Sequence, residues 1–349
     1  MVQRSPLADT VVASHNDSSE KWGFGARVIR VGGVRKVGVL DRLGGREPPP
    51  LLFRRSVRPS SALRPPINLG SVGSLEQRLA DLDDRLRSLG SVLVAFSGGA
   101  DSAFLLAAAA RALGTDAVVA ATAVSASLPG HELAAAADFA AGLGVRHVTP
   151  STDEMARDGY RANAGDRCYF CKAELLDVLL PLADQLDLRH VATGTNADDV
   201  LAGFRPGIRA AFERGAVTPL RDAQLSKDDV RRASRQWGLS TWDKPAAACL
   251  SSRIAYGVEV TPTRLARVER AEVALRAALQ REGIEVRDLR VRDLGDRARV
   301  EVDANLVAVL EKRDDLLARV AGFDAVDVDP RGFRSGSMNE LLREPDRYR

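Results

Sequence analysis

Residues 92–106 of the 349-residue chain read VLVAFSGGADSAFLL, and the fold is organised around them. Five apolar residues, Val92–Phe96, run into two glycines, and an alanine-rich segment follows. Such an apolar run is typical of a buried parallel strand. Glycine permits the tight turn and the close backbone approach that come next. The stretch therefore predicts a strand, a tight loop and a helix.

The loop has the composition of a phosphate-binding turn. Backbone N–H groups at a helix N-terminus attract anions, and hydroxyl side chains add donors. An acidic residue in the loop could orient Mg²⁺ or the nucleotide. The other interpretation is a plain connection in which Asp101 or Ser102 only caps the helix. The loop lacks the Gly-Lys-Ser/Thr ending of a Walker loop and the spacing of a dinucleotide fingerprint. The candidate nucleotide-binding residues are Ser97, Gly98, Gly99, Asp101 and Ser102.

Strands and helices are expected to alternate along the chain after a first amphipathic helix, Ser74–Leu89. This pattern predicts an α/β fold with a doubly wound parallel sheet. Ligands gather at the C-terminal ends of such strands, where Thr122, Thr195 and Asn196 also fall. The expected strands are Val92–Phe96, Ala117–Val124, Val145–Thr149 and His190–Gly194, and the expected helices between them are Ala103–Leu113, Gly130–Leu143 and Lys172–Leu186.

The chain is expected to contain two folded domains. Residues 73–257 would form the nucleotide-binding domain and residues 258–342 a smaller α+β domain. That domain would hold helices over Pro262–Gln280 and Asn305–Val320 and strands over Glu285–Asp293, Ala298–Val302 and Phe323–Val328. Residues 1–72 contain the proline-rich and arginine-rich composition of a disordered leader, and residues 343–349 form a tail.

Composition points to a globular protein with an uneven charge distribution. The chain is 45% hydrophobic and 28% charged, with a net charge of +3. Residues 1–70 hold 12 Lys and Arg against 5 Asp and Glu, so the remainder is mildly acidic. A basic extension can contact nucleic acid, although arginine and proline are also ordinary in unfolded extensions. No apolar run reaches membrane-spanning length and no signal peptide is recognisable, so a cytoplasmic setting is expected.

Three cysteines form the second candidate site. Cys168 and Cys171 have C-x-x-C spacing just before an expected helix, and Cys249 lies in a second polar stretch. The helix N-terminus and the adjacent Arg167 and Lys172 are expected to lower the pKa of the two thiols. From the residues alone, a redox dithiol, a zinc site and a three-thiolate [4Fe–4S] cluster remain open. Cys249 alone could also be a buried structural thiol.

Several motifs occur in the order found in one known family. They are residues 97–102 (SGGADS), 167–172 (RCYFCK), 194–199 (GTNADD), 205–207 (RPG), 244–253 (KPAAACLSSR) and 334–339 (RSGSMN). The first resembles the PP-loop of ATP pyrophosphatases. Together the motifs resemble the ATP-dependent sulfur transferases of the LarE family, over about residues 75–342. The resemblance implies a PP-loop fold of the adenine nucleotide alpha hydrolase type.

The resemblance also implies a two-step reaction. ATP adenylates a substrate carboxylate with release of pyrophosphate, and a sulfur nucleophile then displaces AMP to leave a thiocarboxylate. Lys244 would neutralise the adenylate. In one branch of the family the cysteine matching Cys249 gives up its own sulfur; in another, three cysteines hold a [4Fe–4S] cluster. With Cys168 and Cys171 beside Cys249, the chain resembles the cluster-dependent branch.

The remaining site residues follow from the same resemblance. Asp199 could hold Mg²⁺ or cap the next helix. Arg205 and Arg209 are candidates for substrate phosphate or carboxylate, because guanidinium binds both in bidentate fashion. Arg290 and Arg292 match the family's phosphate-binding pair. Arg253, in the 244–253 motif, completes the set of substrate-binding candidates.

The expected substrate is a pyridinium carboxylate mononucleotide, and the family implies a homo-oligomer. The alternatives are tRNA thiolation, amidation as in GMP or NAD synthesis, and a nucleotide-binding regulator without catalysis. Net acidity of the folded region argues against a nucleic-acid partner. An amidating enzyme would not need three thiols, and a regulator would not be expected to keep them.

Overall fold

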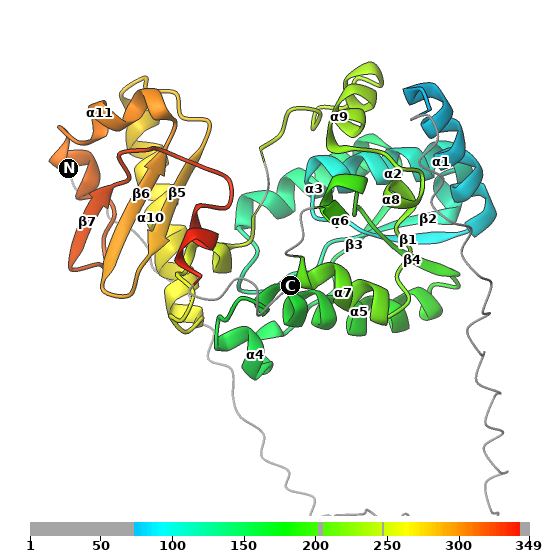
Figure 1. Ribbon diagram of the computed structural model, residues 1–349, viewed down its shortest axis with the longest axis horizontal. Coiled ribbons are helices and arrows are strands. Elements are labelled where there is room, and N and C mark those ends of the chain that lie inside the picture. Colours follow the sequence, from blue (N-terminus) through cyan, green and yellow to red (C-terminus); the bar gives the residue numbers. More distant parts are fainter. Residues whose placement is uncertain (1–72, 202–204, 246–247, 343–349) are drawn as a thin grey trace, which may run out of the picture. The chain divides into compact units, whose positions relative to one another are not determined.

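The computed structural model describes residues 73–201, 205–245 and 248–342. These residues form two β-sheets with their covering helices (Figure 1). The predicted leader over residues 1–72 and the predicted tail over residues 343–349 lie outside the described residues. Within the described ranges, no helix is both long enough and apolar enough to cross a membrane.

The first sheet is parallel throughout, as predicted. Its strands are β1 (Val92–Ala95), β2 (Val118–Ala121), β3 (Arg146–Val148) and β4 (His190–Thr193), in the order β3-β2-β1-β4. The C-terminal ends of all four strands therefore lie at one edge of the sheet. Each strand is shorter than its predicted range, and every strand loses at least one residue at its C-terminal end to the loops at that edge.

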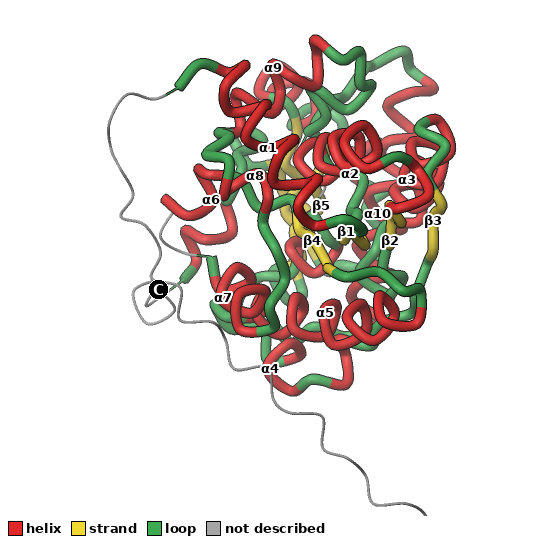
Figure 2. The backbone as a smooth tube through the Cα atoms, turned by 90° about the vertical axis from the view of Figure 1, so that its right-hand side faces the viewer, coloured by secondary structure: helices red, strands yellow, loops and turns green. Residues whose placement is uncertain are grey.

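Helices cover both faces of this sheet (Figure 2). Helices α1, α2, α3 and α9 pack on one face, and helices α5 and α7 pack on the other. The sheet is thus doubly wound, as the alternation of elements predicts. The helices of this part are α1 (Leu75–Leu89), α2 (Ala100–Leu113), α3 (Gly130–Gly142), α4 (Asp158–Arg161), α5 (Arg167–Gln185), α6 (Ala197–Leu201), α7 (Pro206–Glu213), α8 (Pro219–Asp222) and α9 (Lys227–Gln236).

Strand β1 shows why the apolar run could form only a central strand. Val92 and Val94 belong to the core on one face, and Leu93 and Ala95 to the core on the other. All four are buried, because side chains alternate between the two faces and helices cover both. Phe96 continues this core just beyond the strand.

The second sheet is smaller and mixed. Its strands are β5 (Leu289–Asp293), β6 (Arg297–Val302) and β7 (Ala325–Val328); β5 and β6 are antiparallel, and β6 and β7 are parallel. Helix α10 (Pro262–Arg281) packs on it through Leu275 and Leu279, which share a core with the strands. A Thr261 hydroxyl caps this helix at the Arg264 amide.

The prediction of one helix over Asn305–Val320 is wrong. The segment forms α11 (Val307–Leu310) and α12 (Asp314–Leu317), separated at Arg313, whose backbone is not helical (φ -125°, ψ 72°). Leu310 and Leu316 both belong to the core of the second sheet. Six residues apart, they would point about 120° away from each other in one continuous α-helix. The break lets both leucines face the sheet.

Helix α5 begins at Arg167, five residues before its predicted start. The Arg167 side chain is buried and donates to Asn163 Oδ1 and to the Ser251 carbonyl. Asn163, with a positive φ of 51°, donates from Nδ2 to the carbonyls of Ala255 and Val258, each at 2.8 Å. These bonds, which we call the Asn163 clamp, tie the start of α5 to residues 251–258.

Candidate active site

A cavity of about 440 Å³ lies at the C-terminal edge of the first sheet. Segments that follow each of the four strands contribute to its wall, as the topology predicts. The wall includes Ser97, Gly99, Asp101, Ser102, Thr122, Ser125, Ser127, Glu132, Thr152, Glu154, Cys171, Lys172, Thr195, Asp199, Lys227, Arg231, Lys244 and Cys249.

The predicted phosphate loop is held by its own two serines. Ser102 Oγ donates to the Gly99 carbonyl at 3.1 Å and lies 3.2 Å from Ser97 Oγ. The Ser97 amide donates to Ser102 Oγ at 3.3 Å. Gly98 has a φ of 71°, the left-handed region that glycine adopts without strain. The loop therefore has one internally bonded shape in front of α2, whose first turn has free N–H groups.

Gly194 fixes how closely strand β4 approaches this loop. A Cβ atom at Gly194 would lie 2.8 Å from the Ser102 amide nitrogen and 3.0 Å from Ser102 Cα. Only glycine therefore fits between the end of β4 and the start of α2.

Asp101 points a carboxyl oxygen into buried space without a partner. Oδ1 is buried and accepts no hydrogen bond among the described residues. Burial raises the pKa of the Asp101 carboxyl, and a hydrogen bond from the Asn196 side chain opposes that shift. A carboxylate with a spare oxygen beside a phosphate-binding loop has the chemistry to hold a divalent cation.

The Thr122 hydroxyl is used within the fold. Oγ1 donates to the Phe96 carbonyl at 2.8 Å, so it accepts from His147 Nε2, which lies 2.8 Å away. Burial lowers the pKa of His147. Thr195 lies 3.2 Å from Thr193, hydroxyl to hydroxyl, and lines the cavity.

Asn196 and Asp199 form a reciprocal pair at the start of α6. The Asp199 amide donates to Asn196 Oδ1 at 3.1 Å, and the Asn196 amide donates to Asp199 Oδ2 at 3.2 Å. This arrangement is a helix cap. Asp199 also lines the cavity, and its Oδ1 lies 3.5 Å from Arg205 Nη2.

Lys244 reaches the rim of the phosphate loop. Its Nζ donates to the Gly98 carbonyl at 3.0 Å and to Glu132 Oε2 at 2.7 Å. Glu132 comes from the first turn of α3. Two partners thus position the lysine, and its side chain lines the cavity.

The two thiols of the C-x-x-C motif lie in the first turn and a half of α5. Cys171 lines the cavity, whereas Cys168 is the more exposed of the two. The expected lowering of their pKa is wrong. Burial, above all, raises the pKa of both thiols, and Cys249 adds to the shift of each. Arg167 opposes the shift in Cys168, and Lys172 opposes it in Cys171. Desolvation outweighs the adjacent cations that the sequence shows.

Cys249 is anchored from its main chain. The next amide, of Leu250, donates to the Ser127 carbonyl at 2.8 Å, and the Cys249 carbonyl accepts from Arg253 Nη1 at 3.0 Å. Its Sγ lies 2.9 Å from Ser251 Oγ. These contacts hold the thiol at the wall of the same cavity that the phosphate loop lines.

The cysteines are near enough to influence one another's protonation but do not form a ready ligand array. Among the described residues, no group of three or more His, Cys, Asp or Glu side chains is arranged to hold a metal ion. The donor type nonetheless fits a soft iron–sulfur group, because all three side chains are thiols.

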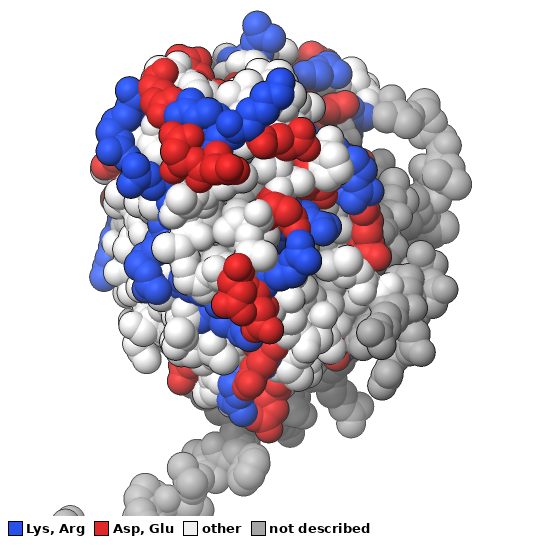
Figure 3. All heavy atoms as spheres, turned by 90° about the vertical axis from the view of Figure 1, so that its left-hand side faces the viewer, with Lys and Arg blue, Asp and Glu red and all other residues white. Residues whose placement is uncertain are grey.

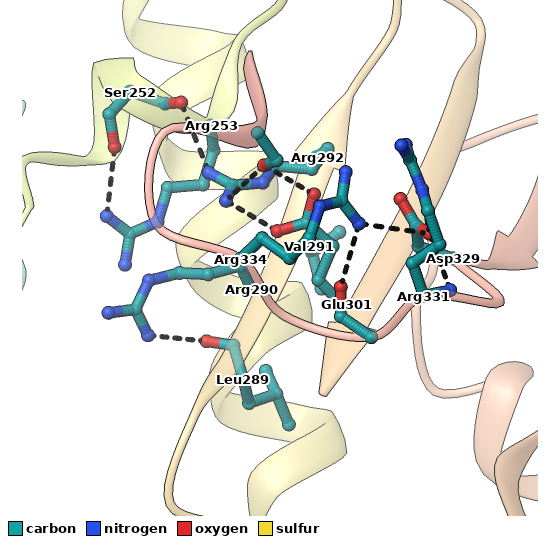
Figure 4. Close-up of polar contacts among 12 residues, drawn as sticks. Ser252, Arg253, Leu289, Arg290, Val291, Arg292, Glu301, Asp329, Arg331 and Arg334 are labelled. Carbon is teal, nitrogen blue, oxygen red and sulfur yellow. Dashed lines mark hydrogen bonds and ion pairs between the residues drawn. The ribbon is translucent and has the colours of Figure 1, made fainter. Parts of the chain in front are cut away.

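Three of the predicted substrate arginines gather between the second sheet and the 3₁₀ helix Leu250–Arg253 (Figure 4). Arg253 is buried and ion-paired with Glu272 at 3.0 Å. Arg292 is buried, pairs with Glu301 at 2.6 Å and leaves its Nε without a hydrogen-bond partner. The Arg290 guanidinium lies on the same side as that of Arg253, and burial and Arg253 lower its pKa.

Arg205 and Arg209 do not line the cavity. Arg209 stacks 4.7 Å above the Tyr169 ring and lies 3.7 Å from Glu213. Both arginine side chains are more than half exposed.

Sequence reasoning missed a set of polar cavity residues. All but Lys172, the last residue of the 167–172 motif, come from segments to which no motif was assigned. They are Ser125, Ser127, Glu132, Thr152, Glu154, Lys172, Lys227 and Arg231.

Comparison with known proteins gives three relatives, and no protein-family model matches the chain. An uncharacterized protein of Synechocystis sp. is 42% identical over 273 residues, 77% of this chain and 99% of that protein. The pyridinium-3,5-bisthiocarboxylic acid mononucleotide synthase of Lactiplantibacillus plantarum is 33% identical over 274 residues, 78% of this chain and 97% of that enzyme. An uncharacterized protein of Methanocaldococcus jannaschii is 26% identical over 175 residues, 50% of this chain and 66% of that protein.

Proposed function

The chain belongs to the LarE family, that of the pyridinium-3,5-bisthiocarboxylic acid mononucleotide synthase, and we propose that it is an ATP-dependent sulfur transferase acting on a pyridinium carboxylate mononucleotide. It would activate the carboxylate with ATP and convert it to a thiocarboxylate, as in the synthesis of a nickel-pincer cofactor.

One observation carries the proposal. The phosphate loop and two of the three thiols, Cys171 and Cys249, open into the same cavity of about 440 Å³. Activation and sulfur transfer need their groups close together, because the acyl-adenylate must be reached before water hydrolyses it. A nucleotide-binding regulator would have no use for this arrangement.

In the first step, the substrate carboxylate oxygen attacks the α-phosphorus of ATP and pyrophosphate leaves. The N–H groups at the start of α2 and the hydroxyls of Ser97 and Ser102 would hold the phosphates. Lys244 would stabilise the negative charge that develops near Gly98. Asp101, whose spare oxygen is buried, and Asp199 are the residues that would hold Mg²⁺.

In the second step, a sulfur nucleophile attacks the acyl carbon, AMP leaves with the bonding electrons, and a thiocarboxylate remains. Cys168, Cys171 and Cys249 are the residues that would hold a [4Fe–4S] cluster. When bound, the cluster would supply a sulfide as the nucleophile. The alternative source of sulfur is Cys249 itself.

The reaction is tested by measuring pyrophosphate release with pyridinium-3,5-dicarboxylate mononucleotide, with tRNA and with neither. We expect release to depend on the pyridinium compound. Lys244→Ala should lower kcat/KM for release about 100-fold, in the range of losses of a transition-state charge contact. The matched control is Lys312→Ala, an exposed lysine of the second sheet's segment. Release driven by tRNA instead would refute the proposed substrate.

The sulfur source is tested by anaerobic purification with iron analysis and a visible spectrum. About four irons per chain are expected for the cluster. Mass spectrometry after reaction separates the alternative, since loss of one sulfur atom at Cys249 would identify it as the donor.

One face of the described part of the protein shows no gathering of basic side chains (Figure 3). Acidic and basic side chains are interspersed on the described part of the face in Figure 3, around an uncharged area. A nucleic-acid partner would be expected to meet a basic stripe or patch.

A further inference from the structure

Glu154 is a buried carboxylate in the cavity wall that the mechanism above does not use. Glu154 is the first residue of the short 3₁₀ helix Glu154–Ala156, and only 3% of the residue is exposed. Ser125 and Ser127 donate to Oε1 at 2.6 and 2.5 Å, and Thr152 donates to Oε2 at 3.2 Å. Because Oε1 receives two hydroxyl protons, it acts purely as an acceptor.

Main-chain hydrogen bonds bring the two serines to the Glu154 carboxylate. The Val124 amide donates to the Pro150 carbonyl at 2.9 Å, and the Thr152 amide donates to the Val124 carbonyl at 3.1 Å. The segments that follow β2 and β3 thus run side by side, which brings the two serines to the carboxylate.

Glu154 differs from the other buried carboxylates in lacking a cation. Among the described residues, four of the five buried acidic side chains are ion-paired: Asp229 with Arg78, Asp293 with Arg264, Glu301 with Arg292 and Asp329 with Arg331. No Lys, Arg or His of the described residues lies within ion-pair distance of Glu154. Neutral hydroxyls only partly replace the solvation that a buried carboxylate loses.

The uncompensated charge faces the sulfur side of the cavity. Cys171 and Cys249 line the same cavity, and the Glu154 charge helps to raise the pKa of the Cys171 thiol. None of the described cations that line the cavity is ion-paired with Glu154; they are Lys172, Lys227, Arg231 and Lys244.

We propose that Glu154, held by Ser125 and Ser127, is a specificity residue that binds the positively charged ring nitrogen of the substrate. This inference rests on the proposed function. In a pyridinium 3-carboxylate, the nitrogen is separated by one ring carbon from the carbon that bears the carboxylate. A carboxylate beside the thiols can therefore face the ring cation while the carboxyl carbon faces the sulfur. A cation in a partly dry cavity is bound more strongly than in water.

The inference is tested with two ligands of the same shape. N-methylpyridinium-3,5-dicarboxylate has a cationic ring, and 5-methylbenzene-1,3-dicarboxylate has a neutral ring with the same substituents. Binding of each to the full chain is measured by calorimetry in the presence of a nonhydrolysable ATP analogue. We expect the wild type to bind the cationic ring about tenfold more tightly, and Glu154→Gln to bind both within about twofold.

Two further variants make the comparison specific. Glu154→Asp keeps the charge and should keep a preference for the cationic ring. Asp138→Asn removes an equal charge from an exposed position of α3 and should behave as the wild type. Affinity for the ATP analogue alone should be the same in all four proteins.

The outcomes that overturn the inference are distinct. Equal binding of both rings by the wild type would overturn it without any variant. A preference for the cationic ring that survives Glu154→Gln would overturn it as well. Loss of ATP-analogue binding in Glu154→Gln would instead assign the carboxylate to the ribose hydroxyls of the nucleotide. If the wild type binds the ATP analogue but neither ring, the proposed substrate class itself fails, and this inference with it.

Discussion

Replacing Gly194 by alanine should disturb both the fold and ATP binding. The added Cβ would lie 2.8 Å from the Ser102 amide nitrogen, whereas ordinary van der Waals contact starts at 3.4 Å. The atoms in the way are backbone, so strand β4 and the start of α2 must separate by about 0.6 Å. Overpacking of this kind typically costs about 1–3 kcal/mol, which for a protein of this size lowers Tm by roughly 2–10 °C.

The same displacement moves the amides that face the phosphates. We therefore expect weaker binding of Mg·ATP to Gly194→Ala by calorimetry, together with the lower Tm. Gly142→Ala is the matched control, because a Cβ there meets nothing within 4 Å and alanine favours the helix end of α3. If Gly194→Ala keeps the Tm and ATP affinity of the wild type, the phosphate loop is not positioned by its contact with β4.

Two further predictions concern groups whose charge is buried. Arg253→Met should lower the free energy of unfolding by about 3 kcal/mol, because it leaves Glu272 without its partner in a largely buried pair; denaturant unfolding measures this, and a loss below about 1 kcal/mol would contradict it. Asp101→Asn should be more thermally stable than the wild type at pH 8. Burial raises the pKa of Asp101 above 3.8, so its ionisation in the folded state costs stability as the pH rises from 3.8 through the folded pKa. The Tm difference should shrink toward pH 4, and a difference independent of pH would refute this account.

The sequence was sufficient for the parts of the fold set by local pattern. Val92–Ala95 is apolar on both faces and is followed by Gly98 and Gly99, so strand, loop and helix were all predictable. The helix over residues 305–320 was not, because the six-residue spacing of Leu310 and Leu316 matters only once a sheet is there to receive both. Helices α7 and α9 received no prediction, because with 8 and 10 residues they are shorter than the window of about 11–18 residues over which helical periodicity is read.

The candidate site was also predictable only in part. Residues within contiguous motifs, such as Ser97 and Cys249, were found at the cavity. Glu154 was not, since its significance depends on Ser125 and Ser127, and on a missing cation, none of which can be read from one position in a sequence. The predicted direction of the thiol pKa shifts was wrong, because the flanking cations are visible in the sequence whereas burial is not.

The Asn163 clamp sets an order in which the chain can assemble. The carbonyls that accept from Asn163 lie 91 to 95 residues further along the chain. Contacts of such separation form late, because a long loop must close first. All four strands of the first sheet are complete by Thr193, so the sheet can form on the ribosome before the clamp's acceptors have been synthesised. Arg253 is among the residues that hold Cys249, so this thiol can be fixed only after residue 253 has emerged. A nascent or truncated chain would thus hold the phosphate loop well before its thiols are in place, and would have no means of completing sulfur transfer.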